Sequence, residues 1–149
     1  MNNDNLRRIK IWQQNTRKSW DAQQTMIHTI GNQYDVVCIQ EPHFDFQNIT
    51  RATKVWHVVV PTNFKQGEGA ELTQEERERR RPRALMLIHK RISTSSWTQI
   101  EVDSRDVVAV KILGETGVIN IYNIYNDCTH SRTLEEMGRH LEKREAEAI

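Results

Sequence analysis

The stretch Val36-Val37-Cys38-Ile39-Gln40-Glu41-Pro42 joins a continuous apolar run to an abrupt stop. A short apolar run closed by a proline is typical of a buried β-strand that ends suddenly. Ligands of α/β sheets bind beyond the carboxyl ends of the strands, so the carboxylate of Glu41 is a candidate metal or substrate ligand. A Glu-Pro pair is also common in ordinary turns, and that simpler interpretation stays open at this point.

An earlier strand with a polar end precedes this stretch. Residues 6–14 are predicted to form a strand that runs into Asn15, and a helix from near Ser19 to about Ile30 follows it. A strand, a helix and a strand in this order predict a βαβ unit with parallel strands. The two strand ends would then present the Asn15 amide and the Glu41 carboxylate to one spot.

The rest of the chain is predicted to be mostly strands, followed by a helix. Residues 62–82 are very polar and are predicted to form a long loop or insertion that could contain one short helical turn. The final helix is predicted from a capping box at Thr133 and Glu136, with an apolar stripe of Leu134, Met137 and Leu141. Further strands are predicted at residues 55–60, 84–89, 97–102, 107–113 and 118–125.

This order of elements predicts an α/β sandwich, in which helices flank a mixed β-sheet. Residues 1–149 would form part of a single domain, with residues 6–149 as its core. We expect the strand at residues 118–125 to leave an exposed sheet edge, because only a helix follows it.

Charge and cysteine content narrow the classes of function. The formal net charge is +1, so any contact with nucleic acid must come from a local basic patch. Cys38 and Cys128 are too far apart for a zinc motif, which favours an intracellular protein, nuclear or cytoplasmic, with Cys38 as a buried apolar residue. No apolar run approaches the length of a membrane span, so we expect no membrane partner.

Three polar residues at strand ends could form a site for phosphate chemistry. Mg²⁺ prefers oxygen ligands and usually takes one or two carboxylates, with water and phosphate completing its shell. Glu41 could supply the carboxylate, and Asn15 could orient a water molecule or a phosphate oxygen. Tyr125 could donate its hydroxyl to a phosphate oxygen. His43 is close to Glu41 in sequence, but a surface loop histidine is the simpler interpretation.

The strand-end motifs resemble those of a known family. Gln14-Asn15, Ile39-Gln40-Glu41-Pro42 and Asn123-Ile124-Tyr125 occur in this order, and each closes a predicted strand. The ordered set looks like the endonuclease/exonuclease/phosphatase superfamily, which includes deoxyribonuclease I and the exonuclease III-type abasic-site endonucleases. The resemblance is strongest to the endonuclease domain of LINE-type (non-LTR) retrotransposons, and it covers the chain from about Leu6 onward.

This resemblance implies a Mg²⁺-dependent enzyme that hydrolyses phosphodiester bonds and nicks DNA, with Mn²⁺ as a substitute metal. Glu41 would be the metal ligand, Asn15 would lie near the metal and the scissile phosphate, and Tyr125 would contact that phosphate. The family's Gly-Asp-Phe-Asn and Ser-Asp-His motifs, which serve to activate the water, do not occur in this sequence. The resemblance therefore implies the N-terminal part of an incomplete four-layer fold, weak or inactive alone, whose sheet edge needs the missing C-terminal half or a partner chain.

Other interpretations stay open. Arg79, Arg80, Arg81 and Arg83 could contact DNA phosphates, but interleaved glutamates favour a solvated, mobile loop. The chain could instead be a non-catalytic remnant that binds nucleic acid or protein. A phosphatase-type member that acts on a small phosphorylated substrate would use the same residues.

Overall fold

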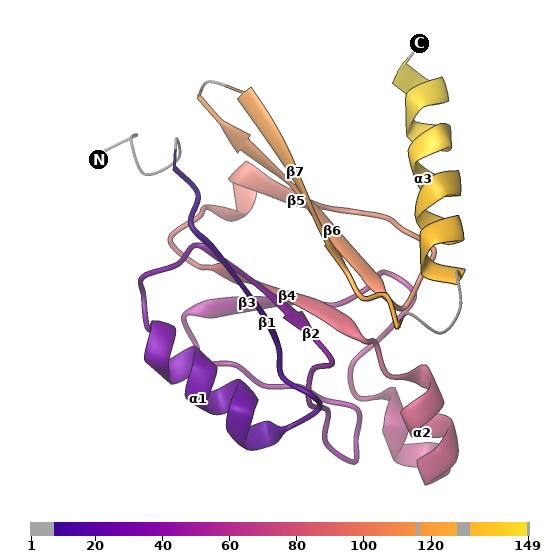
Figure 1. The fold of residues 1–149 in the computed structure, drawn as a ribbon. Coiled ribbons are helices and arrows are strands. Elements are labelled where there is room, and N and C mark those ends of the chain that lie inside the picture. The colour runs from indigo at the N-terminus through magenta and orange to yellow at the C-terminus, as the bar shows by residue number, and fades with distance from the viewer. Residues whose placement is uncertain (1–7, 116, 128–131, 149) are drawn as a thin grey trace.

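The computed structural model describes residues 8–115, 117–127 and 132–148, which form two β-sheets packed face to face (Figure 1). The four-stranded sheet has the order β1-β2-β4-β3, and the three-stranded antiparallel sheet has the order β5-β6-β7. The strands of the first sheet are β1 (Ile11–Asn15), β2 (Val36–Gln40), β3 (Trp56–Val59) and β4 (Ala84–His89). Those of the second sheet are β5 (Trp97–Ile100), β6 (Val107–Gly114) and β7 (Gly117–Ile124).

A helix covers the outer face of each sheet, which produces four layers. Helix α1 (Trp20–Ile30) packs Met26, Ile27 and Ile30 on the four-stranded sheet, and α3 (Arg132–Ala148) packs Met137 on the three-stranded one. The inner faces of the two sheets meet in a core that contains Cys38, Met86 and Val110, among other residues. The predicted α/β sandwich, with a mixed sheet flanked by helices, is confirmed.

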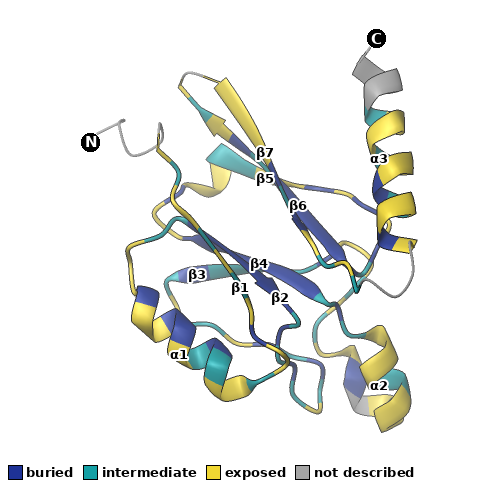
Figure 2. Cartoon of the chain, in the orientation of Figure 1, coloured by how far each residue is buried: buried dark blue, intermediate teal, exposed yellow. Residues whose placement is uncertain are grey.

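All five residues of β2 are buried (Figure 2). Val36 and Cys38 face the second sheet, whereas Val37 and Ile39 face α1. A strand covered on both faces gains from apolar residues at every position, which explains its continuous apolar run. The predicted burial of Cys38 is confirmed, since the residue is only 5% exposed.

The predicted βαβ unit is present, and its register sets two polar strand ends side by side. Strands β1 and β2 are parallel, and Asn15 pairs with Gln40. The Ser19 hydroxyl accepts a hydrogen bond from the Ala22 amide and so caps the first turn of α1. The helix ends at Gly31, whose φ of 52° suits glycine.

The segment at residues 62–82 is more ordered than predicted. A 3-10 helix (Glu68–Glu71) is followed by α2 (Gln74–Arg80), so the segment holds more helix than the one short turn that the sequence suggested, and the prediction of a long loop is wrong. Thr73 caps α2 by accepting a hydrogen bond from the Glu76 amide. Acidic residues lie in the first turn of α2 and arginines in the last, an order that suits the helix dipole.

Two details of α3 also differ from prediction. Thr133 lies inside the helix, so it is not the N-cap; its buried hydroxyl donates to Asp106 Oδ2 at 3.1 Å. Of the predicted apolar stripe, only Met137 is buried, because Leu134 and Leu141 remain 57% and 51% exposed. The predicted exposed edge is present: among the described residues, β7 pairs only with β6.

Candidate active site

The backbone at Glu41 is held on both sides of the residue. Its amide donates to the Arg83 carbonyl at 2.9 Å. Its carbonyl accepts from the Lys18 amide at 2.7 Å and from the Thr16 hydroxyl at 3.0 Å. These bonds tie the end of β2 to the start of β4 and to the turn after β1, so the half-buried Glu41 side chain leaves from a fixed point.

This turn and Glu41 concentrate backbone strain. In the described part of the chain, four residues other than glycine have left-handed φ angles, and three of them meet here: Arg17 (51°), Lys18 (60°) and Glu41 (49°). Such conformations cost about 1–3 kcal/mol each, and they cluster at functional sites in proteins. The strain therefore marks this end of β1 and β2 as a candidate site.

Tyr125 approaches Glu41 from the other sheet. Its hydroxyl donates to Glu41 Oε1 at 3.3 Å, although the two residues are 84 positions apart in sequence. The Tyr125 amide donates to the Asp106 carbonyl at 2.8 Å, which fixes the backbone just beyond β7. Burial and the nearby Glu41 carboxylate raise the pKa of Tyr125 above its ordinary value, so its hydroxyl remains a donor at neutral pH.

Arg83 packs against the Tyr125 ring and is itself fixed by two carboxylates. Its guanidinium makes two bonds to the Asp106 carboxylate, at 2.8 and 2.7 Å, and a third to Asp127 at 3.3 Å. It also lies over the Tyr125 ring, 4.9 Å from the centroid. The bond to Asp106 raises the pKa of Arg83 further, so the cation is permanent. Asp106 carries no signal in the sequence, since nothing local distinguishes it from a turn residue.

A chain of side-chain amides, of which Gln40 and Asn123 are buried, joins the two sheets beneath the site. The Gln40 side chain accepts a hydrogen bond from Gln13 and donates one to Asn123. Asn123 also donates to the carbonyls of Ile39, at 3.0 Å, and Leu85, at 2.7 Å. A buried amide must find partners, so these bonds set the register of β7 over β2 and β4. Gln40 and Asn123 therefore act as positioning residues, which the sequence motifs included without explaining.

A cleft of about 420 Å³ opens beside Glu41. Its lining is rich in cations and includes Lys18, Arg81, Arg83 and Arg105. His43 also lines the cleft, and burial together with Arg81 lowers the pKa of His43, so its ring is neutral at physiological pH. A carboxylate beside a cationic cleft suits an anionic ligand such as a phosphate group, with or without a metal ion.

The predicted site residues are only partly brought together. Glu41 and Tyr125 share a hydrogen bond, but Asn15 is exposed, and its Oδ1 accepts from the Arg17 amide at 2.8 Å. Among the described contacts, none joins Asn15 to Glu41 or Tyr125. Asn15 therefore lies at the neighbouring strand end, where its side chain caps the strained turn.

The four arginines proposed as DNA contacts do not lie in a mobile loop. Arg79 and Arg80 are exposed on α2, whereas Arg81 follows α2 and donates to Asn48 Oδ1 at 2.7 Å and to the Asp45 carbonyl at 3.1 Å. Arg83 is held by Asp106, as described above. Arg81 and Arg83 are thus fixed components of the cleft wall, and only Arg79 and Arg80 project freely from α2.

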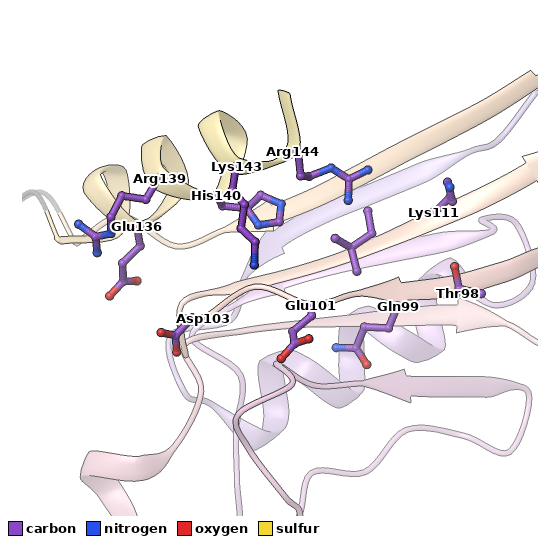
Figure 3. A pocket seen from close by; sticks show the side chains of 11 residues that line it. Thr98, Gln99, Glu101, Asp103, Lys111, Glu136, Arg139, His140, Lys143 and Arg144 are labelled. Atoms are coloured by element: carbon purple, nitrogen blue, oxygen red, sulfur yellow. The ribbon is translucent and has the colours of Figure 1, made fainter. Parts of the chain in front are cut away.

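A larger hollow lies elsewhere, between α3 and the three-stranded sheet (Figure 3). It measures about 670 Å³. Glu101 and Asp103 lie on one side, opposite Arg139, Lys143 and Arg144 on α3. Because its opposed walls carry charges of both signs and no strained backbone, we place the candidate active site in the smaller cleft.

The donor set at Glu41 fits Mg²⁺ held largely by water and substrate. The Glu41 Oε1 atom receives the Tyr125 hydroxyl, and among the described contacts nothing donates to Oε2. The described residues contain no group of three or more His, Cys, Asp or Glu side chains that could enclose a metal. Mg²⁺ commonly takes one or two carboxylates and completes its shell with water and phosphate oxygens, so one carboxylate beside a cation-lined cleft fits this ion.

The fold and the strand-end site define an α/β sandwich with a candidate anion site at one end of its sheets. In a comparison with solved structures, the chain is similar to the "Endonuclease domain of TRAS1, a telomere-specific non-LTR retrotransposon". The TM-score is 0.61 at 15% identity, and the match covers 92% of this chain and 54% of that one. The chain thus spans about half the length of that domain.

This likeness confirms, at the level of the fold, the resemblance that the strand-end motifs indicated. No protein-family model matches the sequence, and no curated protein matches it either. In the described part of the chain, no helix is long and apolar enough to cross a membrane.

Proposed function

We propose that this chain is the N-terminal part of a Mg²⁺-dependent phosphodiesterase domain, by resemblance a DNA-nicking endonuclease of a retrotransposon. The observation that carries the proposal is the hydrogen bond from Tyr125 to Glu41 at the mouth of a cationic cleft. It joins two residues that the sequence motifs singled out independently. The likeness to an endonuclease domain supports the same function.

Each residue has a distinct role in this proposal. Glu41 would hold Mg²⁺ through its carboxylate, and the ion would supply charge neutralisation for a phosphodiester. Tyr125 donates its hydroxyl toward a phosphate oxygen, which its raised pKa permits at neutral pH. Asn15 contributes its amide from the neighbouring strand end. The cations of the cleft attract the polyanionic substrate.

The chain is expected to be weak or inactive alone. The motifs that activate the attacking water in the resembling family are missing from its 149 residues. His43 lines the cleft, but its ring packs edge-on against Trp20 with centroids 5.4 Å apart, and we assign it no role in proton transfer. Binding of metal and DNA is therefore expected without efficient hydrolysis.

Three measurements test this proposal. Isothermal titration with Mg²⁺ should give binding to the wild-type chain that is lost in Glu41→Ala, and anisotropy of a labelled duplex should show DNA binding. A chain that binds neither Mg²⁺ nor DNA would contradict the proposed function. A plasmid-nicking assay with Mg²⁺ completes the test: strong nicking that depends on Glu41 would support the chemistry but overturn the expectation of an inactive part.

The edge of β7 favours a second candidate, a remnant that binds a partner. The strand contains no charged residue and no proline, the features that commonly protect a sheet edge. Val118, Ile119 and Ile124 are exposed on it, at 56%, 42% and 38%. The four-stranded sheet, which faces the three-stranded sheet of β7, has one strand more. On that longer sheet, Ile11 of the edge strand β1 is 42% exposed. The edge thus suits one added strand, supplied by another polypeptide segment in which apolar residues alternate with polar ones.

The two candidates differ in what Glu41 does. A binding remnant would keep its salt-dependent DNA affinity in Glu41→Ala but would lose it when Arg79 and Arg80 are neutralised. An enzyme part would lose Mg²⁺ binding in Glu41→Ala. A phosphatase-type member would respond to small phosphate esters rather than to duplex DNA.

A further inference from the structure

Lys18 occupies a conformation that its backbone role does not explain. Its φ of 60° lies in the left-handed region, and Arg17 before it has the same conformation, at 51°. The Lys18 amide donates to the Glu41 carbonyl at 2.7 Å, so the turn itself has a clear function. Glycine would make this bond without the steric penalty, because it has no Cβ. The turn alone therefore does not require a lysine.

The side chain of Lys18 lacks the partners that its neighbours have. Arg83 is paired with Asp106 and Asp127. Among the described contacts, the Lys18 ammonium has no hydrogen bond or ion pair, yet Lys18 lines the same cleft as Glu41. A compact ammonium on a flexible stem is well suited to contact a phosphate as a point charge.

The lining of the cleft around Lys18 carries more cations than carboxylates. Four cations line it together with Glu41 and Glu78, and of these cations Arg83 and Arg105 lie within ion-pair distance of Asp106, which is outside the lining. Burial and the neighbouring Arg83 guanidinium lower the pKa of Arg105, as expected where cations are crowded together. An anion bound here would relieve that crowding, and among the described contacts the Lys18 ammonium has no partner that it would have to leave to reach it.

We propose that Lys18 contacts a backbone phosphate of bound nucleic acid in this cleft, and that the strained turn at Arg17 and Lys18 places it beside Glu41. The inference rests on the proposed function, because it names a substrate-binding residue of the same site. Lys18 is a binding residue in this scheme, and it takes no part in bond making or breaking.

The test uses the intact chain and separates strain from charge. Lys18→Gly removes both the ammonium and the steric penalty. Arg17→Gly is the strain-matched control, since it relaxes the adjacent residue, which does not line the cleft. Lys90→Gln is the charge-matched control; Lys90 is exposed, just beyond β4 at the end opposite Arg83. Each variant is measured for melting temperature and, by anisotropy, for affinity toward a labelled duplex at several salt concentrations.

We expect Lys18→Gly to melt about 2 °C higher than the wild type, because the strain is relieved. Its DNA affinity should fall about three- to tenfold, and the salt slope should decrease by about one, as for the loss of one phosphate contact. Arg17→Gly should melt higher and bind with a smaller loss, and Lys90→Gln should bind like the wild type.

Equal affinity and equal salt slope in Lys18→Gly and Lys90→Gln would overturn the proposal while leaving the proposed function intact. A wild-type chain that does not bind duplex DNA would overturn both. A thermal-shift arm with inorganic phosphate distinguishes the ligand source. A Lys18-dependent shift with phosphate, without DNA binding, would assign the cleft to small phosphate esters and overturn the nucleic-acid contact.

Discussion

Replacing Asp106 with asparagine tests whether the ion pair beneath the site holds the domain together. The Asp106 side chain is 3% exposed and that of Arg83 is 21% exposed, and two short hydrogen bonds join them. Removing one partner of a buried pair typically costs about 3–5 kcal/mol, because the other charge is left unpaired. Asp127 remains 3.3 Å from Arg83, so we expect the lower end of that range, about 3 kcal/mol.

A loss of this size lowers the melting temperature of a chain of this length by about 6–12 °C. Urea unfolding followed by tryptophan fluorescence measures it directly. Arg51→Ala is the control: that residue pairs with Asp45 at 3.5 Å but is 59% exposed, so its loss should stay below about 1 kcal/mol. Thr133→Val isolates the hydroxyl bond to Asp106, with an expected loss of about 1 kcal/mol. A loss below 1 kcal/mol for Asp106→Asn would refute the assigned role of the pair.

Three further outcomes are expected. Burial raises the pKa of the Cys38 thiol to about 11, from 9.0. In a Cys128→Ser variant, a thiol reagent at pH 8 should therefore modify Cys38 about a hundredfold more slowly in the folded than in the unfolded chain. Equal rates would contradict the burial of Cys38. Burial lowers the pKa of His89 below 6.5, so the unfolded state binds more protons than the folded state under acid conditions. The contribution of His89 to stability should therefore be full above about pH 6.5 and fall as the pH drops. Urea midpoints at pH 7.5 and 5.5 should differ less in His89→Gln than in the wild type. Ile119→Lys places a charge on the exposed edge of β7 and should reduce association between copies of the chain, measured by sedimentation at high concentration. An unchanged sedimentation profile would argue against association through this edge.

The local pattern of the sequence predicted most strands and their order. The apolar run at residues 36–40 and the capped helix before it predicted the parallel βαβ unit, because both depend on interactions within a few residues. The same reasoning failed at residues 62–82, where polarity suggested a loop. There, Thr73 and the order of charges along α2 stabilise the helix. Because α2 buries no residue, its sequence has no apolar periodicity that would predict a helix.

The candidate site was predictable as a set of strand ends but not as an arrangement. Glu41, Asn15 and Tyr125 were found because each stands at the end of a predicted strand. Asn15 turns toward the Arg17 amide rather than toward Glu41, since the strained turn provides a nearby donor. Asp106 has no local signature, because its importance comes from Arg83, 23 positions away.

The sequence alone therefore determined the order of the strands, the burial of β2 on both faces and the polar character of three strand ends. Periodicity and strand stops are local properties, and a single chain displays them directly. Only the tertiary structure decided which polar groups meet: Tyr125 with Glu41, Arg83 with Asp106, and Lys18 with a cleft that leaves its charge unpaired. Such meetings depend on the register of two packed sheets, which the buried amides of Gln40 and Asn123 set across more than eighty residues.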